Sequence, residues 1–150
     1  MYKIKSLSRD FIVRENLSLV FHEKGDYGYF LLKKEYLNTK ETLLLISKYL
    51  RLNLSKFGYA GLKDKNAETH QYISIYKPNL EKINGLKLKN TSLRFIGYGN
   101  KTISLGQLES NDFIITVRNL DRKYKKINFI ENYFDEQRFS SRNRDIGKNV

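Results

Sequence analysis

The first third of the chain alternates short apolar runs with turn residues, a pattern typical of β-strands. An apolar run occupies residues 11–13, and residues 17–21 alternate leucine and phenylalanine with other side chains. Turn chemistry at residues 23–26 precedes the aromatic, β-prone segment 27–32. These patterns predict a strand at 11–13 and a hairpin whose two strands are 17–21 and 27–32.

A helix is predicted next, because a start signal precedes helical periodicity. Asn38 can cap the helix, and Glu41 three residues later completes a capping box. One face at helical spacing carries Leu43, Ile46, Ser47 and Leu50. We expect this helix to end near Asn53.

The rest of the chain predicts more strands and a second helix. Residues 56–62 form an apolar, glycine-containing run typical of a buried strand, and the polar residues 63–69 predict a loop. Further strands are expected at 71–76, 92–98, 103–105 and 113–118. An amphipathic helix is expected over 123–134, with an inward face made of Tyr124, Ile127, Ile130 and Phe134. The order predicts one α+β domain over residues 1–150, with a mainly antiparallel mixed sheet and flanking helices.

Composition narrows the class of protein. The chain has 150 residues, of which 40% are hydrophobic, so it can bury a core. It has no long apolar run and no signal-peptide pattern at its start, so we expect no membrane association. It contains no cysteine, and its two histidines, His22 and His70, cannot make a zinc site alone. These features predict a metal-free protein of the cytoplasm.

Charge raises the possibility of a nucleic-acid partner. Lys and Arg total 28 against 16 Asp and Glu, a formal net charge of +12. Such an excess attracts polyanions, and the 11 Tyr and 9 Phe could stack on unpaired bases. The alternatives are a basic surface that only confers solubility, and aromatic residues that only fill the core.

The segment 57–71 carries the most specific chemistry. An apolar run delivers Asp64 into a polar loop between Lys63 and Lys65, and lysines beside a carboxylate favour its ionised, nucleophilic form. Small residues before it, including Gly61, would allow another backbone or a ligand to come close. From the residue types alone, Lys-Asp-Lys is more typical of an exposed turn than of a catalytic site.

The whole segment resembles the catalytic motif of the TruD-type tRNA pseudouridine synthases. The resemblance rests on residues 58–65, Gly-Tyr-Ala-Gly-Leu-Lys-Asp-Lys, followed by Ala67, Thr69 and Gln71. Other segments that resemble the family occur in the family's order, before and after this motif, at residues 5–15, 38–39, 105–118, 132–134 and 137–139. The chain departs from the family pattern at Ser110, Glu131, Asp135 and Ser140, and it stops where family members continue with more of the catalytic sheet and an inserted domain.

The resemblance implies an isomerase that converts a uridine of tRNA, by the family's habit uridine 13, into pseudouridine without any cofactor. It implies that Asp64 is the nucleophile, that Lys5 pairs with it, and that Asn111 hydrogen-bonds nearby. Phe113 would stack on the target base, with Phe11 as a second aromatic of the site. For each of these residues an ordinary structural role is the alternative: a solvated lysine, a turn asparagine or a core phenylalanine.

The short length leaves several possibilities open. The chain is an N-terminal fragment, half of a split enzyme, or a remnant. A companion polypeptide carrying the missing strands is expected if the chain is functional, since open strand edges tend to pair. The competing functions are a non-catalytic RNA-binding module and a basic structural or ribosome-associated protein. A pure RNA binder has no need of a carboxylate beside its anionic ligand.

Overall fold

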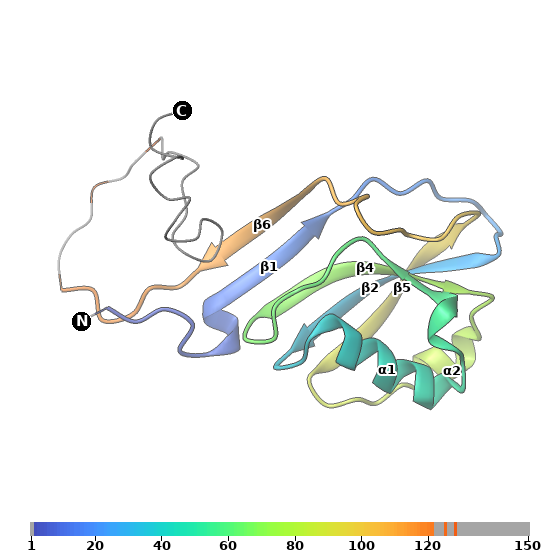
Figure 1. Ribbon diagram of the computed structural model, residues 1–150, viewed down its shortest axis with the longest axis horizontal. Coiled ribbons are helices and arrows are strands. Elements are labelled where there is room, and N and C mark those ends of the chain that lie inside the picture. Colours follow the sequence, from blue (N-terminus) through green and yellow to red (C-terminus); the bar gives the residue numbers. More distant parts are fainter. Residues whose placement is uncertain (1, 122–124, 126–127, 129–150) are drawn as a thin grey trace, which may run out of the picture. The chain divides into compact units, whose positions relative to one another are not determined.

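The computed structural model describes residues 2–121 together with 125 and 128. The chain divides into two compact units, residues 1–120 and 121–150, and the fold below is that of the first unit. Its strands are β1 (Phe11–Asn16), β2 (Tyr27–Glu35), β3 (Phe57–Tyr59), β4 (Glu68–Tyr76), β5 (Thr91–Gly99) and β6 (Ser110–Ile115). Its α-helices are α1 (Thr39–Leu50) and α2 (Leu80–Asn84), as Figure 1 shows.

The strands form one mixed sheet in the order β5-β2-β4-β1-β6, and β3 also pairs with β4. Only β1 and β4 run parallel; every other pair is antiparallel. The predicted α+β class with a mainly antiparallel mixed sheet is therefore confirmed. Two strands share one side of β4, because β1 pairs with Glu68–His70 and β3 with Ile73–Ile75. At this fork, Glu15 Oε2 accepts a hydrogen bond of 3.1 Å from the Tyr72 backbone N–H.

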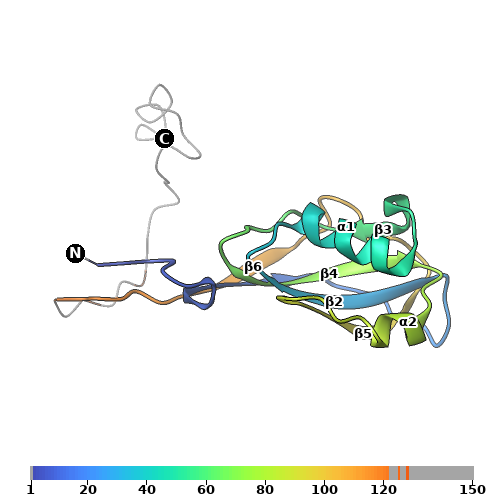
Figure 2. The same ribbon diagram turned by 90° about the horizontal axis from the view of Figure 1, so that it is seen from below.

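The core lies on both faces of the sheet. On the first face, sheet residues such as Phe30 and Ile73 pack with Leu43, Ile46 and Leu50 of α1. Figure 2 shows α1 lying along this face. A smaller cluster on the second face includes Tyr29, Ala60 and Ile103, with Leu17 and Leu19 packed against it.

Helix α1 begins where the sequence predicts. Asn38 Oδ1 accepts from the Glu41 backbone N–H at 2.8 Å, and Glu41 Oε2 accepts from the Asn38 backbone N–H at 3.0 Å. The helix ends at Leu50, earlier than the predicted Asn53, because Arg51 adopts a left-handed conformation with φ 56°. The short helix α2, capped by Asn79, has no counterpart among the predicted elements.

Two predicted strands are wrong. Residues 17–21 and 103–105 are irregular, so 27–32 is not half of a hairpin with 17–21; β2 pairs with β4 and β5 instead. The alternation at 17–21 arises because Leu17 and Leu19 pack onto the second face from a loop. The predicted strands 11–13, 56–62, 71–76, 92–98 and 113–118 correspond to β1, β3, β4, β5 and β6, with shifted ends. Of the predicted helix 123–134 only residues 125 and 128 are described, and the segments at 132–139 that resemble the family lie outside the described residues.

Other parts of the chain pack closely against the backbone at Gly58 rather than at Gly61. A Cβ on Gly58 would collide with Thr102 Oγ1, the Ile103 carbonyl oxygen and Ser74 Oγ, whereas one on Gly61 would meet only Lys63 Nζ at 3.5 Å and a Leu108 methyl at 3.9 Å. A backbone carbonyl cannot move aside cheaply, so the loop at 102–103 requires glycine at 58.

Gly58→Ala is expected to destabilise the fold by about 2 kcal/mol, since overpacking typically costs 1–3 kcal/mol. Gly61→Ala is the matched control in the same segment and should stay within about 0.5 kcal/mol of the wild type. Urea unfolding followed by circular dichroism measures both. Equal stability of the two variants would contradict the packing argument.

Candidate active site

Asp64 lies in the loop between β3 and β4 and presents its carboxylate at the surface. Its side chain is 65% exposed, and its Oδ2 lies 3.8 Å from Lys5 Nζ. The predicted partnership between Lys5 and Asp64 is therefore present in the geometry, although the two residues are 59 positions apart in sequence. Because the carboxylate is accessible and has one cation beside it, it can reach a ligand that enters from solvent.

The backbone around Lys5 is anchored to the end of the sheet. Lys3 and Arg118 exchange two backbone hydrogen bonds of 2.9 and 2.8 Å. Arg118 also donates from Nε and Nη2 to the two carboxylate oxygens of Asp10, at 2.8 and 2.7 Å. This bidentate pair lowers the pKa of the Asp10 carboxyl. Lys5 has φ 54°, a left-handed conformation uncommon for a residue other than glycine.

Two aromatic rings continue the site from Lys5. The Lys5 ammonium lies 3.8 Å from the centroid of the Phe11 ring, a cation–π arrangement. The ring of Phe11 lies 5.8 Å from that of Phe113, centroid to centroid. Phe113 is on β6, opposite Val13, and is 56% exposed. The fold thus brings Asp64, Lys5, Phe11 and Phe113 into one continuous series of neighbours.

Asn111 occupies a neighbouring but different position. It faces Glu15 across the β1–β6 pair, two residues from Phe113 on the same strand. Its Oδ1 is buried and has no hydrogen-bond partner among the described residues. Asn111 therefore lies on the same side of β6 as Phe113, and its contact with Asp64 stays a prediction. Ser110, where the family usually has glycine, fits as the first residue of β6 and its Oγ accepts a hydrogen bond of 3.0 Å from Asn16.

The lysines that flank Asp64 in sequence pair with other carboxylates. Lys63 points inward and lies 3.7 Å from Glu15 Oε1, with side chains 5% and 0% exposed. Lys65 lies 3.7 Å from Glu41 Oε1, and both of these side chains are largely exposed. The sequence predicts that these flanking lysines support the Asp64 carboxylate. In the structure they pair with Glu15 and Glu41, and Lys5 is the lysine that lies beside Asp64. Burial raises the pKa of Glu15, although the charge of Lys63 opposes that effect.

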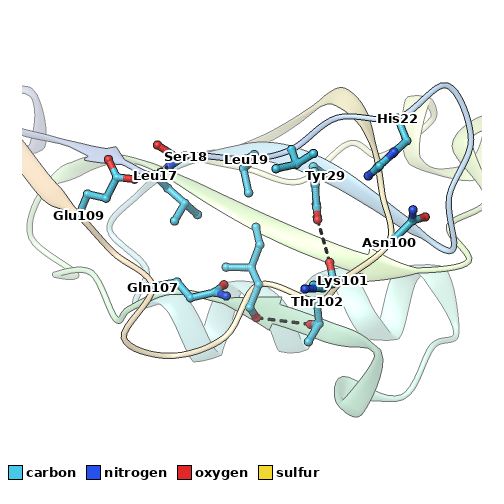
Figure 3. Close-up of a pocket in the computed structure, with 12 residues that line it drawn as sticks. Leu17, Ser18, Leu19, His22, Tyr29, Asn100, Lys101, Thr102, Gln107 and Glu109 are labelled. Atoms are coloured by element: carbon cyan, nitrogen blue, oxygen red, sulfur yellow. Dashed lines mark hydrogen bonds between the residues drawn. The ribbon is translucent and has the colours of Figure 1, made fainter.

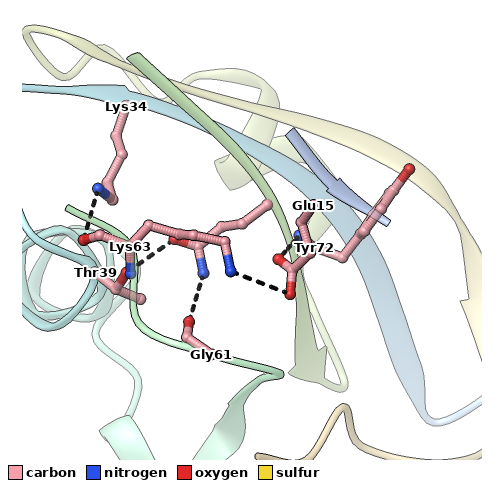
Figure 4. Close-up of polar contacts among 7 residues, drawn as sticks. Glu15, Lys34, Thr39, Gly61, Lys63 and Tyr72 are labelled. Atoms are coloured by element: carbon pink, nitrogen blue, oxygen red, sulfur yellow. Dashed lines mark hydrogen bonds and ion pairs between the residues drawn. The ribbon is translucent and has the colours of Figure 1, made fainter. Parts of the chain in front are cut away.

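The backbone before and at Asp64 is held by buried side chains from three elements (Figure 4). Gln71 Nε2 donates to the Gly61 carbonyl at 3.2 Å, and Thr39 Oγ1 accepts from the Lys63 N–H at 2.9 Å. Thr39 Oγ1 donates to Gln71 Oε1 at 2.9 Å, which links the two supports. Lys34 Nζ donates to the carbonyls of Lys63 and Asp64. Sequence reasoning did not identify Lys34, because a Lys-Lys pair at a strand end resembles a solvated terminus.

Two larger pockets occur among the described residues. An apolar pocket of about 510 Å³ beside α1 is lined in part by Leu44, Leu54 and Leu62. Another, of about 520 Å³, lies on the second face of the sheet between the loops at 17–22 and 100–109 (Figure 3). There the Tyr29 hydroxyl donates to the Lys101 carbonyl at 2.9 Å. Asp64 lines neither pocket.

Two further features bear on cofactors and membranes. No group of three or more His, Asp or Glu side chains that could hold a metal ion occurs within the described part of the chain. No helix among residues 2–121 is long and apolar enough to cross a membrane.

Comparison with a solved structure identifies the class of protein to which this fold belongs. The crystal structure described as that of tRNA pseudouridine synthase D (TruD) from Methanosarcina mazei superposes with a TM-score of 0.76 at 34% identity, over 79% of this chain and 27% of that one. The mixed sheet described above is thus of the pseudouridine synthase type.

Sequence comparison defines the family. The family model "tRNA pseudouridine synthase D (TruD)" matches residues 2–150, and the chain belongs to this family. The tRNA pseudouridine synthase D of Aquifex aeolicus is 40% identical over 152 residues, which cover 93% of this chain and 40% of that protein. A relative from Thermococcus onnurineus is 35% identical over 160 residues, covering 97% of this chain and 38% of its own length. The chain therefore spans about two fifths of the length of these relatives.

Lys63→Met is expected to destabilise the fold by about 3 kcal/mol, because it leaves the buried Glu15 carboxylate without its cation. The double variant Lys63→Met, Glu15→Gln should recover part of that loss, since no unpaired charge then remains. Lys65→Met is the control, since it breaks an ion pair of the same length at the surface, which is worth about 0–1 kcal/mol. Guanidinium unfolding of the wild type and the three variants measures these losses. Equal losses for Lys63→Met and Lys65→Met would disprove the role of burial.

Proposed function

We propose that residues 1–150 are the N-terminal part of the catalytic domain of an enzyme that converts a uridine of tRNA, by family resemblance uridine 13, to pseudouridine. The observation that supports this most directly is the Asp64 carboxylate, 3.8 Å from the Lys5 ammonium, which itself lies over Phe11. Membership of the family and the relatives' names support the same reaction. A tRNA substrate fits a net charge of +12. The cytoplasm is the location that we propose for this reaction.

Each residue has a role in this proposal. The reaction breaks the N-glycosidic bond of the uridine, turns the freed uracil and joins it to the sugar through carbon. The product is an isomer of the substrate, so the chemistry balances without an oxidant, a reductant or a nucleotide cofactor. Asp64 acts as the nucleophile, and Lys5 places a positive charge beside it.

The target base must leave the RNA stack to reach Asp64. Phe113, more than half exposed at the sheet edge, offers a ring on which the extruded base can stack, and Phe11 extends this surface toward Lys5. Asn111 is proposed to hydrogen-bond near the nucleophile. An accessible carboxylate repels phosphate, which disfavours the alternative of a purely RNA-binding module.

Asp64→Asn is expected to abolish pseudouridine formation, lowering the rate by at least about 1,000-fold, while leaving the fold and tRNA affinity nearly unchanged. The assay uses unmodified tRNA, this chain and the rest of the enzyme, and maps pseudouridine at each position. Asp26→Asn is the matched control, because Asp26 is 62% exposed and lies 3.9 Å from Lys77. An Asp64→Asn protein that still forms product would remove Asp64 from the mechanism.

The partner polypeptide is proposed from the two edges of the sheet. Among the described strands, β5 has only β2 as a neighbour, and β6 has only β1. Edge strand β5 exposes Ser92 and Arg94, polar residues that discourage further pairing. Edge strand β6 instead exposes Phe113, Ile114 and Ile115 by 56%, 46% and 51%. We propose that a further polypeptide segment, continuous with this chain or separate, adds to the sheet at β6.

Ile114→Lys is expected to weaken binding of the remaining segment at least about tenfold, because it places a charge on an edge that must be buried. Ser92→Lys, on the opposite edge, should bind like the wild type. Titration of each protein with the remaining part of the enzyme, read by light scattering and calorimetry, makes the comparison. Unchanged affinity for Ile114→Lys would exclude β6 as the contact.

A further inference from the structure

Lys34 is a buried lysine on β2 that no part of the proposed reaction uses. It is fully buried, and its ammonium group donates hydrogen bonds to three backbone carbonyls. The acceptors are Leu37 at 2.7 Å, Asp64 at 2.9 Å and Lys63 at 3.4 Å. An ammonium group has three N–H donors, so all three are used. Figure 4 shows Lys34 reaching the backbone of the Asp64 loop from the neighbouring strand.

The three acceptors join two segments that are distant in sequence. Leu37 immediately precedes the capping residue of α1, whereas Lys63 and Asp64 belong to the loop between β3 and β4. Lys34 therefore connects the start of α1, the middle of the sheet and the backbone of the candidate nucleophile through one charged group. Hydrogen bonds from a cation are stronger than those between neutral groups, so this connection is stiff.

The side chain of Asp64 has little else to hold it. Its carboxylate is 65% exposed and its only ion pair among the described residues is the one with Lys5, itself 39% exposed. Ion pairs this open contribute little to order. The position of the carboxylate therefore depends chiefly on where the Asp64 backbone is fixed. The Asp64 carbonyl accepts a hydrogen bond from Lys34 Nζ.

We propose that Lys34 is a positioning residue for the reaction. Its ammonium group holds the carbonyls of Leu37, Lys63 and Asp64, and this fixes the position of the nucleophile relative to the base-stacking rings. This inference rests on the proposed function of Asp64. Lys34 does not touch the carboxylate, so it acts through the backbone, whereas Lys5 acts on the charge itself. Small displacements of a reacting group lower a rate steeply, by about 100-fold for 1 Å.

The surroundings of Lys34 make the clamp sensitive to pH. Burial lowers its pKa to about 8, while the charges of Asp64 and Glu41 oppose that shift and the charge of Lys63 adds to it. As the pH rises through that value, the ammonium becomes an amine with two N–H donors. One of the three carbonyls then loses its donor, and the loop loosens.

The activity test compares Lys34→Met with Ile75→Ala, a cavity variant in the fully buried core of the first sheet face. Both are assayed as the complete enzyme, this chain with the remaining part, under single-turnover conditions at equal concentrations of folded protein. Lys34→Met should lower the rate constant about 100-fold with tRNA affinity nearly unchanged, whereas Ile75→Ala should keep its rate. Equal rates for the two variants would overturn the positioning role.

A measurement on the unmodified chain decides the case if Lys34→Met fails to fold. With ¹³C-labelled protein, the carbonyl resonances of Leu37, Lys63 and Asp64 should shift together with one midpoint near the Lys34 pKa of about 8. Independent midpoints, or no shift between pH 7 and 9, would show that no shared ammonium clamps them. An inactive wild-type enzyme would refute the proposed function instead, and the carbonyl titration would still decide whether Lys34 holds the loop.

Discussion

Part of the backbone of the loop that carries Asp64 is buried without a strand or helix to satisfy it, and this constraint shapes the surrounding side chains. Buried N–H and C=O groups need partners, since an unpaired one costs as much as a lost hydrogen bond. Here Gln71, Thr39 and Lys34 supply them, each from a different element of the fold. Burying a lysine is expensive unless its donors are all used, and those of Lys34 are. The outcome is a fixed backbone under an exposed carboxylate.

The fork in the sheet explains how the loop and the aromatic rings come to share one support. Strand β4 has β1 beside its first half and β3 beside its second half, and the chain leaves β3 to form the Asp64 loop at that gap. Glu15, on β1, accepts from Tyr72 in the gap and pairs with Lys63 of the loop. Because Phe11 is on the same strand as Glu15, the strand that presents the ring also anchors the loop. A shift of β1 would therefore move both parts of the site together.

The sequence predicted those parts of the structure that local chemistry determines. The capping box at Asn38 located the start of α1. The resemblance names Lys5, Phe11, Phe113 and Asp64; the structure places these residues in one series of neighbours, and their roles stay predictions. The predictions from sequence failed where packing between distant segments determines the local structure. Residues 17–21 alternate like a strand, yet they follow the apolar second face as a loop, and only His22 makes a backbone bridge, with Tyr98.

The inward direction of Lys34 depends on strand register, which short-range patterns cannot supply. Lys33 and Lys34 are adjacent and chemically identical, and neighbouring positions on a strand point to opposite faces. Lys33 pairs with Glu68 at 3.0 Å on one face, and Lys34 enters the interior on the other. Choosing between them requires knowing that Lys34 lies opposite Thr69, hence on the side of α1. Lys63 and Lys65 are also alike in sequence, yet in the loop between β3 and β4 only Lys63 reaches a buried partner.

Strand β6 links the proposed addition of a further strand to the sheet with the candidate active site around Asp64. Phe113, the ring proposed to stack on the base, lies on an edge strand whose exposed apolar residues favour a further strand. An edge strand with a single neighbour is held by half the hydrogen bonds of an interior strand, so its side chains are less well fixed. Arg118, just beyond β6, also anchors the segment that carries Lys5. A strand added at β6 would therefore steady the stacking ring and, through Arg118, the cation beside Asp64, which couples completion of the sheet to completion of the site.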